Sequence, residues 1–360
     1  MTALKTLQDI GQSIWLDSIS RELLESGTLA RYIANFSVTG LTSNPTIFEH
    51  AIAASDRYDA TIRRHLEPEY SAERLFFDFA LDDVVAAADL FRPIYDASGG
   101  RDGFASIEVS PTLADDAARS VAEGKALFAR AERPNVLIKV PGTGAGLLAI
   151  EELIAAGIPV NVTLLFSRGQ VRAAAEAYLR GIEQRVDIGL GAHVPSVASL
   201  FVSRWDGATA SRLPPALANR LGIAIAQRSY KIYREILASD RWRRLAEAGA
   251  QPQRLLWAST GTKDPALPAG YYLTALAAEG TVNTVPEKTL RSLAESGAVE
   301  GLLGTDTAEA DAVVEAVGKA GIDVDALATK LQADGRDSFV KSWKDLLACI
   351  ESKRKTMRAA

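Results

Sequence analysis

Cysteine is almost absent from this chain of 360 residues, in which Cys349 is the single example. One thiol cannot form a disulfide within the chain, a CxxC redox pair or a cysteine-rich zinc site. A lack of disulfides is typical of proteins that work in a reducing compartment, so we expect a cytoplasmic protein.

Histidine is also scarce, since the chain has only His50, His65 and His193. These residues form no HExxH pair, and we expect surface or structural roles for them and no bound metal. Serine hydrolase chemistry is not expected either, because Ser199 and Ser259 lack the GxSxG motif that places a nucleophilic serine on a sharp turn.

Two further features are missing, a long uncharged apolar run and an excess of basic residues. No stretch approaches the roughly 18 apolar residues of a membrane-spanning helix. The first residues, MTALKTLQDIGQSIW, have no basic start followed by an apolar segment. The formal net charge of −5 gives no general attraction to a nucleic-acid backbone. We therefore expect no export, no membrane partner and no nucleic-acid partner.

Short apolar or β-branched runs recur along the whole chain, and each is followed by a loop and a helical pattern. This alternation predicts βα units around a parallel sheet. The expected strands cover residues 13–18, 38–43, 105–110, 135–140, 159–165, 197–203, 254–259 and 281–285. Eight units without a long linker favour closure of the sheet. The sequence therefore predicts an α/β fold, a single (β/α)8 TIM barrel.

We expect residues 1–360 to form this one barrel domain. Amphipathic patterns at about 309–352 predict additional C-terminal helices appended to the barrel rather than a second domain. The last residues, 351–360, are expected to be a frayed and solvated end.

Side chains alternate between the two faces of a strand, so the polar residues can be assigned to the barrel interior or to the helices. In the strand at 135–140, Val136, Ile138 and Val140 share the face that suits the helices. The other face then carries Lys139, which is expected to point into the barrel.

The strand at 159–165 follows the same rule. Val162 and Leu164 are expected to face the helices, which directs Asn161 and Thr163 inward. Four more polar residues fall at mid-strand or toward the carboxyl ends of their strands, where barrel enzymes place catalytic groups. They are Asp17, Glu108, Ser199 and Ser259.

A buried lysine beside carboxylates permits imine chemistry. Its amine can attack a carbonyl, and the protonated imine then accepts electrons from a C–C bond that breaks next to it. Asp17 or Glu108 could act as the base, while the other serves proton transfer during imine formation and hydrolysis. The structural alternative is an ion pair between Lys139 and one of these carboxylates that only holds the barrel together.

The segment PGTGAG after the fourth predicted strand could be mistaken for a phosphate-binding loop. Its glycines, Gly142, Gly144 and Gly146, do not match GxGxxG, and the next strand ends without an acidic residue for a ribose. We interpret the segment as a tight turn between a strand and a helix.

Three segments resemble the signature segments of transaldolases. They are GLTSNPTIF, NVLIKVPGTGAGLLAIEELIAAGIPVNVTLLFS and SLFVSRWD, and the similarity extends over all eight predicted strands. The resemblance implies a cofactor-independent transferase of the pentose phosphate pathway. Such an enzyme moves a dihydroxyacetone unit from a ketose phosphate, fructose 6-phosphate or sedoheptulose 7-phosphate, to an aldose phosphate, erythrose 4-phosphate or glyceraldehyde 3-phosphate.

The resemblance also implies roles for individual residues. Lys139 would form the Schiff base, and Asp17 would be the acid and base of the C–C step. Glu108 and Thr163 would position water and move protons during imine formation. The residues implied to bind the hydroxyls of the three-carbon unit are Asn44, Asn161 and Ser199.

The substrate phosphate would meet Arg204, with Ser259 nearby. A second arginine found in many transaldolases is missing after Ser259, where the chain reads STGTKDP. Lys263 is the expected substitute, with a solvated loop lysine as the alternative.

Two other functions remain open from the sequence. One is a related Schiff-base aldolase that cleaves fructose 6-phosphate and releases free dihydroxyacetone. Phe201 and Glu108 argue against it, because the resemblance places them where such aldolases tend to carry tyrosine and glutamine. The other is a barrel that binds a phosphosugar without catalysis, which would have no use for a buried amine beside two carboxylates.

Overall fold

A computed structural model describes residues 3–295, 298–299 and 301–359. Within these ranges eight parallel strands follow one another around a closed barrel, and the last strand pairs with the first. The predicted fold is thus confirmed. The strands are β1 (Ser13–Leu16), β2 (Val38–Leu41), β3 (Phe104–Glu108), β4 (Val136–Pro141), β5 (Val160–Leu165), β6 (Ser196–Phe201), β7 (Arg254–Ala258) and β8 (Val282–Val285).

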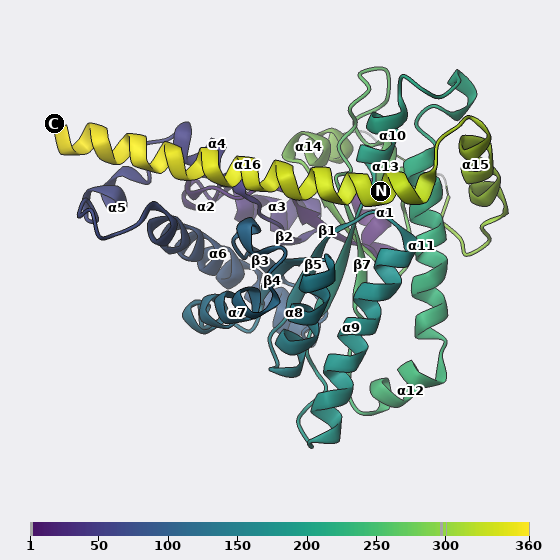
Figure 1. The fold of residues 1–360 in the computed structure, drawn as a ribbon, viewed down its shortest axis with the longest axis horizontal. Helices are drawn as coiled ribbons and strands as arrows, with labels where there is room; N and C mark the ends of the chain where they lie inside the picture. The colour runs from purple at the N-terminus through teal and green to yellow at the C-terminus, as the bar shows by residue number, and fades with distance from the viewer. Residues whose placement is uncertain (1–2, 296–297, 300, 360) are drawn as a thin grey trace.

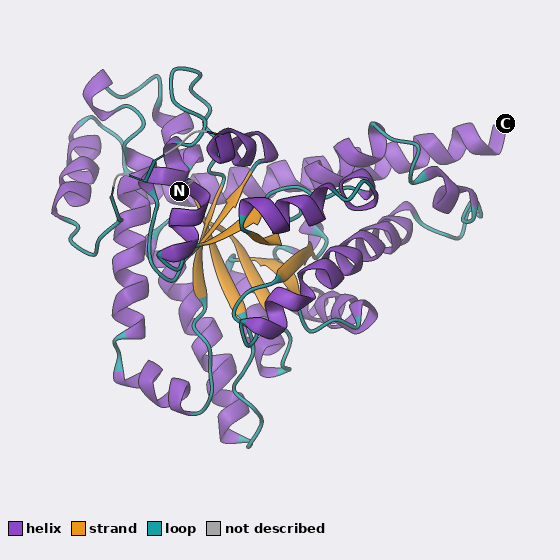
Figure 2. Ribbon diagram, turned by 180° about the vertical axis from the view of Figure 1, so that it is seen from behind, coloured by secondary structure: helices purple, strands orange, loops and turns teal. Residues whose placement is uncertain are grey.

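Helices surround the barrel on all sides, as Figures 1 and 2 show. The N-terminal half contains α1 (Ala3–Asp9), α2 (Arg21–Glu25), α3 (Thr28–Phe36), α4 (Pro45–Ala53), α5 (Asp59–Arg63), α6 (Ala72–Ala97), α7 (Ala117–Ala131) and α8 (Gly144–Ala155). The remainder contains α9 (Arg168–Asp187), α10 (Ser203–Thr209), α11 (Leu221–Leu237), α12 (Asp240–Glu247), α13 (Tyr271–Ala275), α14 (Glu287–Glu295), α15 (Ala308–Lys319) and α16 (Val324–Ala359). Two short 3₁₀ turns cover Pro111–Leu113 and Pro215–Leu217.

The alternation of side chains in β4 is as predicted. Val136, Ile138 and Val140 belong to the apolar cluster between the barrel and its helices. Leu137 belongs to a second cluster, which fills the barrel interior and continues to α16. Lys139 therefore points inward with Leu137.

The prediction for Leu164 in β5 is wrong. Leu164 has a left-handed backbone conformation with φ of 59°, and the register between β5 and β6 shifts between Val162 and Leu165. Because of this irregularity Leu165 takes the position facing the helices, while Leu164 joins the interior cluster. A β-bulge of this kind breaks simple alternation.

The segment PGTGAG forms the expected tight turn. Thr143 caps α8 by accepting a hydrogen bond from the backbone N–H of Gly146. A Cβ atom at Gly146 would lie 1.8 Å from the carbonyl oxygen of Pro141, so only glycine fits there.

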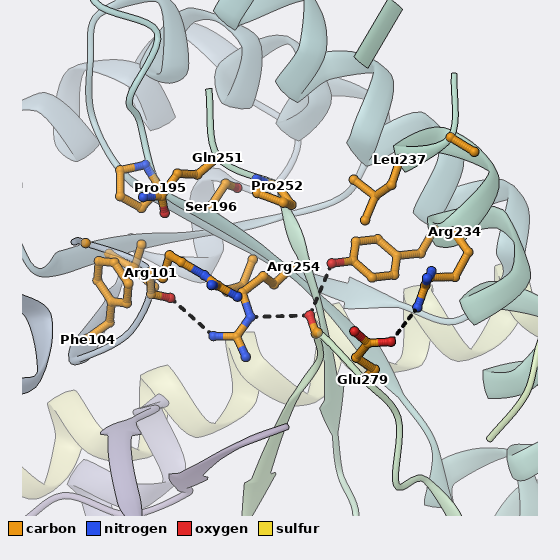
Figure 3. Close-up of a pocket in the computed structure, with 16 residues that line it drawn as sticks. Arg101, Phe104, Pro195, Ser196, Arg234, Leu237, Gln251, Pro252, Arg254 and Glu279 are labelled. Atoms are coloured by element: carbon orange, nitrogen blue, oxygen red, sulfur yellow. Dashed lines mark hydrogen bonds and ion pairs between the residues drawn. The ribbon is translucent and has the colours of Figure 1, made fainter. Parts of the chain in front are cut away.

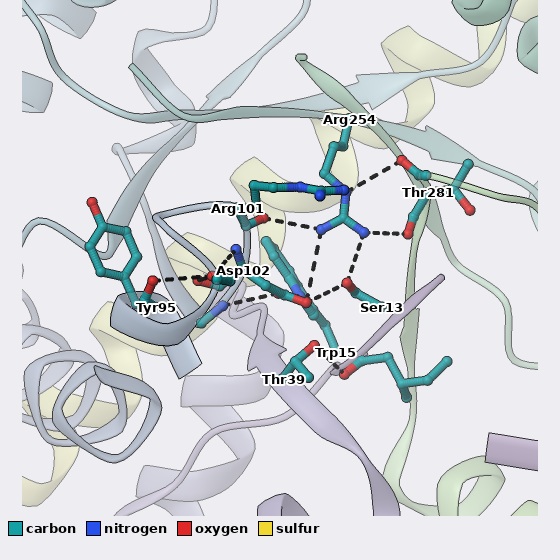
Figure 4. A network of polar contacts seen from close by, with 12 residues as sticks. Ser13, Trp15, Thr39, Tyr95, Arg101, Asp102, Arg254 and Thr281 are labelled. Atoms are coloured by element: carbon teal, nitrogen blue, oxygen red, sulfur yellow. Dashed lines mark hydrogen bonds and ion pairs between the residues drawn. The ribbon is translucent and has the colours of Figure 1, made fainter. Parts of the chain in front are cut away.

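A polar network closes the amino ends of the strands (Figure 4). The Asp102 carboxylate accepts hydrogen bonds from Trp15 Nε1, at 2.8 Å, and from Ser13 Oγ. The Arg254 guanidinium donates to Ser13 Oγ at 2.7 Å and to the carbonyl of Thr281 at 2.6 Å. The first residues of β1 and β7 are thereby tied to the loop before β3.

A cavity of about 320 Å³ opens at the same end of the barrel, lined in part by Arg101, Arg234, Arg254 and Glu279 (Figure 3). Its charged groups are largely paired, since Arg234 contacts Glu279 and Arg254 contacts Asp102. Polar residues at the amino ends of barrel strands serve stability, whereas active sites lie at the carboxyl ends.

The prediction of a frayed end is wrong for 351–359, because α16 continues to Ala359, although most of these residues are solvated as expected; residue 360 lies outside the described residues. Lys353 donates to the carbonyl of Ser55 at 2.6 Å, and the buried Arg354 donates to the carbonyl of Glu67 at 2.6 Å. These long side chains reach loop carbonyls next to α5 and fix the last turns. In Figure 1 the helix runs across the top of the barrel and beyond it.

Within the described ranges, no helix is both long enough and apolar enough to cross a bilayer.

Candidate active site

A cavity of about 110 Å³ lies at the carboxyl ends of the strands. Most of the residues singled out from the sequence line it, together with several that were not. The lining residues are Asp17, Thr42, Asn44, Lys139, Thr163, Ser199, Phe201, Arg204, Leu256, Ala258, Ser259, Thr284 and Phe339.

Lys139 lies at the base of this cavity and is held by two oxygen atoms. Its Nζ is 3.3 Å from Glu108 Oε2 and donates to the carbonyl of Ser43 at 3.0 Å. The two charged residues are direct neighbours across β3 and β4, where Glu108 is in register with Lys139. Their side chains are only 7% and 4% exposed, which makes this an almost fully buried ion pair.

Burial raises the pKa of the Glu108 carboxyl, and the nearby Lys139 ammonium offsets part of this effect. The Glu108 carboxyl thus holds a proton more readily than a solvated glutamate does. A carboxyl whose pKa is raised in this way is better suited to accept and return a proton than a solvated glutamate.

Asp17 follows the last residue of β1 and lines the same cavity. Thr42 Oγ1 donates to Asp17 Oδ1 at 2.9 Å and lies 2.7 Å from Thr284 Oγ1. Burial raises the pKa of the Asp17 carboxyl, whereas the charge of Lys139 and the bond from Thr42 act in the opposite direction. Asp17 is therefore a stronger base than an exposed aspartate.

Two buried oxygen atoms in this region have no hydrogen-bond partner among the described residues. They are Glu108 Oε1 and Thr163 Oγ1, and both residues are at most 5% exposed. Buried polar atoms are nearly always paired with protein, water or ligand. These two atoms are consequently suited to bind a water molecule or a substrate hydroxyl.

Asn161 does not line the cavity, but it is bonded to a residue that does. Ser199 Oγ donates to Asn161 Oδ1 at 2.7 Å, and Asn161 Nδ2 donates to Ser106 Oγ at 3.2 Å. Asn44 caps α4 by accepting a bond from the N–H of Ile47 at 3.0 Å. Because only Oδ1 is used there, the Asn44 amide can still donate to a ligand.

Arg204 lies in the first turn of α10, at the rim. Its guanidinium carbon is 5.1 Å from the ring centre of Phe201 and 6.0 Å from that of Phe339. No carboxylate forms an ion pair with Arg204 in the part of the chain that the structure describes. Burial lowers the pKa of its guanidinium, yet arginine remains charged at neutral pH. An anionic group of a ligand is the natural partner of such a cation.

Ser259 and Lys263 both follow β7 but lie at different cavities. Ser259 Oγ is at the rim of the 110 Å³ cavity and is 3.0 Å from Ser203 Oγ. Lys263 instead lines a neighbouring cavity of about 390 Å³, which Ser203 also borders. The structure therefore does not bring Lys263 into the cavity that contains Lys139.

Sequence reasoning missed Thr42, Thr284 and Phe339. Alternation in β8 could have found Thr284, which shares a face with the interior residue Val282. Thr42 lies in the segment GLTSNPTIF together with Asn44, so this segment could also have indicated Thr42. Nothing in the sequence indicated Phe339, because an aromatic residue in an amphipathic helix is expected to belong to the hydrophobic core.

The three histidines lie outside this cavity. His50 and His193 are exposed, and the ring of His65 stacks on Tyr70 with centres 4.2 Å apart. Across the described residues, no group of three or more His, Cys, Asp or Glu side chains is arranged to hold a metal.

A buried lysine paired with a carboxylate at the carboxyl end of a barrel is typical of enzymes that form imines with carbonyl substrates. Comparison with known families agrees with this class. Residues 14–350 match the family model described as Transaldolase/Fructose-6-phosphate aldolase, and the chain belongs to this family.

Curated relatives extend the similarity over the whole chain. A protein of Thermobifida fusca named Transaldolase is 44% identical over 357 residues, which cover 96% of each chain. A Transaldolase of Arthrobacter sp. strain FB24 is 43% identical and covers 100% of this chain and 99% of its own. Transaldolase 1 of Streptomyces avermitilis is 44% identical over 96% of this chain and 94% of its own.

Proposed function

We propose that this protein is a transaldolase that carries a dihydroxyacetone unit on Lys139. The donor is a ketose phosphate, fructose 6-phosphate or sedoheptulose 7-phosphate, and the acceptor is erythrose 4-phosphate or glyceraldehyde 3-phosphate. The observation that carries the proposal is the buried ion pair of Lys139 with Glu108, in which Lys139 lines the same cavity as Asp17.

Imine formation needs a group that takes and returns a proton. Glu108 Oε2, 3.3 Å from Lys139 Nζ, accepts a proton from the amine, which then attacks the ketone carbon. The same carboxyl returns the proton to the carbinolamine hydroxyl, which leaves as water. Thr163 Oγ1 and Glu108 Oε1 bind that water, which would satisfy two buried atoms that otherwise lack a partner among the described residues.

Asp17 acts in the C–C step. It takes the proton from the hydroxyl whose carbon becomes the aldehyde, and its raised pKa supports this role. The C–C bond breaks, and its electron pair moves into the protonated imine to give an enamine on Lys139. Attack of the enamine on the acceptor aldehyde reverses these steps, and hydrolysis of the new imine releases the product.

The hydroxyls of the three-carbon unit bind Asn44, Ser199 and Asn161. The hydrogen bond between Ser199 and Asn161 fixes the direction of both side chains before substrate arrives. The phosphate binds Arg204, with Ser259 nearby at the rim. The location of Lys263 at a separate cavity favours Arg204 as the main phosphate ligand.

A Schiff-base aldolase that releases dihydroxyacetone is the second candidate, because the family includes fructose-6-phosphate aldolases. The names of the relatives and the presence of Phe201 and Glu108 favour transfer. A barrel that only binds phosphosugars is disfavoured, because a buried amine and two carboxylates are costly without a catalytic use. The proposed setting is the pentose phosphate pathway in the cytoplasm, supported by the single cysteine.

The test is the intact mass after incubation with fructose 6-phosphate and sodium borohydride, followed by peptide mapping. We expect a reduced dihydroxyacetone adduct on Lys139, and none in Lys139→Ala, which should still fold. Transfer to erythrose 4-phosphate should exceed cleavage without an acceptor. Absence of the adduct from the folded wild-type protein would refute the proposal, and equal rates with and without acceptor would favour the aldolase.

A further inference from the structure

Phe339 of α16 lies directly above the proposed catalytic groups. Its ring centre is 5.5 Å from Lys139 Nζ and 6.0 Å from the guanidinium carbon of Arg204. The side chain belongs to the interior cluster and is almost completely buried. A residue close to the C-terminus thus forms one wall of a cavity whose other walls come from the barrel.

The segment that carries Phe339 is fixed on both sides. Before it, Gln332 Nε2 donates to the carbonyls of Gly142 and Leu164 at 3.0 and 2.9 Å, which ties α16 to the ends of β4 and β5. After it, Thr46 Oγ1 donates to Ser342 Oγ at 2.8 Å. The Phe339 ring is therefore held over the cavity by contacts to three separate parts of the barrel.

Gly335, one turn before Phe339, lets α16 approach Arg204 closely. A Cβ atom at this position would lie 2.9 Å from Leu164 Cδ2 and 3.3 Å from Arg204 Nη1. Glycine inside a helix costs about 1 kcal/mol relative to alanine. The close packing of α16 on Arg204, the proposed phosphate ligand, explains why glycine occupies position 335.

The volume of the cavity limits what it can enclose. At about 110 Å³ it is well below the roughly 300–1,000 Å³ of pockets that enclose drug-sized ligands. The three-carbon unit on Lys139 lies within this cavity, and the rest of a sugar phosphate with six or seven carbons extends toward Arg204 at the rim. Once the aldehyde half has left, the Phe339 ring covers the three-carbon unit on Lys139.

We propose that Phe339 is a positioning residue that keeps water from the enamine, and so favours transfer over release of free dihydroxyacetone. This inference rests on the proposed function. If water reaches the enamine, it donates a proton to the nucleophilic carbon and regenerates the protonated imine, and the hydroxide left behind takes the proton that Asp17 accepted in the C–C step. A second water adds to the imine carbon, the Lys139 amine leaves, and dihydroxyacetone is set free. An aromatic ring over the site keeps bulk water from the first of these steps, protonation of the enamine carbon, whereas the water bound at Glu108 and Thr163 remains available for hydrolysis of the imine.

The experiment compares Phe339→Ala with Phe339→Leu and with Ser338→Ala, a substitution at the neighbouring exposed position. Free dihydroxyacetone and transfer product are measured together, with fructose 6-phosphate as donor and erythrose 4-phosphate as acceptor. We expect the ratio of release to transfer to rise roughly tenfold in Phe339→Ala. It should stay near the wild-type value in Phe339→Leu, which keeps an apolar cover, and in Ser338→Ala.

Other outcomes separate this inference from the proposed function. Parallel loss of transfer and release in Phe339→Ala, with an unchanged ratio, would reduce Phe339 to a structural role and overturn the inference. If Phe339→Ala does not fold, Phe339→Val replaces it, and an unchanged ratio there has the same meaning. A wild-type protein without a borohydride adduct would instead refute the proposed function.

Discussion

The ionisable side chains of Lys139, Glu108 and Asp17 do not balance in charge. Lys139 is paired with Glu108 at 3.3 Å, and Asp17 adds a second carboxylate whose hydrogen bond comes from a neutral threonine. With all three ionised, the buried group carries a net negative charge. An unbalanced buried charge lowers stability, so catalysis and stability make opposite demands on Asp17.

We predict that Asp17→Asn is more stable than the wild type at pH 7, by about 1 kcal/mol. The folded-state pKa of Asp17 is raised above its ordinary value of 3.8. As pH rises from 3.8 toward the folded pKa, the native carboxyl holds a proton that the unfolded chain has lost, so the free energy of unfolding falls. Asparagine does not ionise, so the variant avoids this fall in the free energy of unfolding. Urea unfolding of both proteins at pH 7 and pH 4 measures the difference.

The gain from Asp17→Asn should shrink at pH 4, since the wild-type carboxyl is then partly protonated in both states. The variant should also form the borohydride adduct but cleave the donor very slowly. A variant less stable than the wild type at pH 7 would contradict the charge argument. Failure to form the adduct would move Asp17 from the C–C step to imine chemistry.

At the level of elements, alternation in the strands predicted the interior positions of Lys139 and Thr163 from residue types alone. It failed at Leu164, because a left-handed residue and a register shift leave no trace in the hydrophobic pattern. The alternation in the strands also gave no indication that α16 forms a wall of the cavity. Contacts such as that between Phe339 and Lys139 join residues far apart in the chain and depend on how a helix is laid over the barrel.

Gly335→Ala tests how tightly α16 packs on Arg204. We predict a several-fold higher KM for fructose 6-phosphate, because the added methyl group would lie 2.9 Å from Leu164 Cδ2 and displace Arg204. The gain of about 1 kcal/mol in helix propensity should be offset by this crowding, so the melting temperature should not rise.

Gly318→Ala in α15 is the matched control, since a Cβ atom there meets no atom within 4 Å. It should raise the melting temperature slightly and leave the KM unchanged. An unchanged KM together with a raised melting temperature in Gly335→Ala would show that the helix has room over Arg204.

At the level of the whole molecule, the barrel separates its two ends. The carboxyl ends carry the cavity that contains Lys139, and near it lie two oxygens without partners among the described residues, Glu108 Oε1 and Thr163 Oγ1. The amino ends contain the well-bonded network of Asp102 and Arg254. The count of βα units predicted the closed barrel, but no local pattern predicts a network that joins β1, β7 and the loop before β3.

We predict that Asp102→Ala lowers the free energy of unfolding by about 3 kcal/mol, because it leaves the mostly buried Arg254 without its carboxylate. The kcat and KM for transfer should be unchanged, since the network lies at the end opposite the candidate active site. Chemical denaturation and steady-state kinetics measure the two effects.

Asp96→Ala is the control for this prediction. Asp96 forms an exposed ion pair with Arg92, and its loss should change stability by less than about 1 kcal/mol. A large loss of kcat in Asp102→Ala at full stability would contradict the division of the barrel into a structural and a catalytic end.

The path of α16 also has a consequence for the order in which the protein is made. Asp17 leaves the ribosome long before Phe339, yet both line one cavity. Because chains begin to fold from the N-terminal side during synthesis, β1 to β8 can assemble while the residues of α16 are still untranslated. The nascent barrel would then expose its reactive lysine to metabolites until the residues of α16 emerge and supply the missing wall.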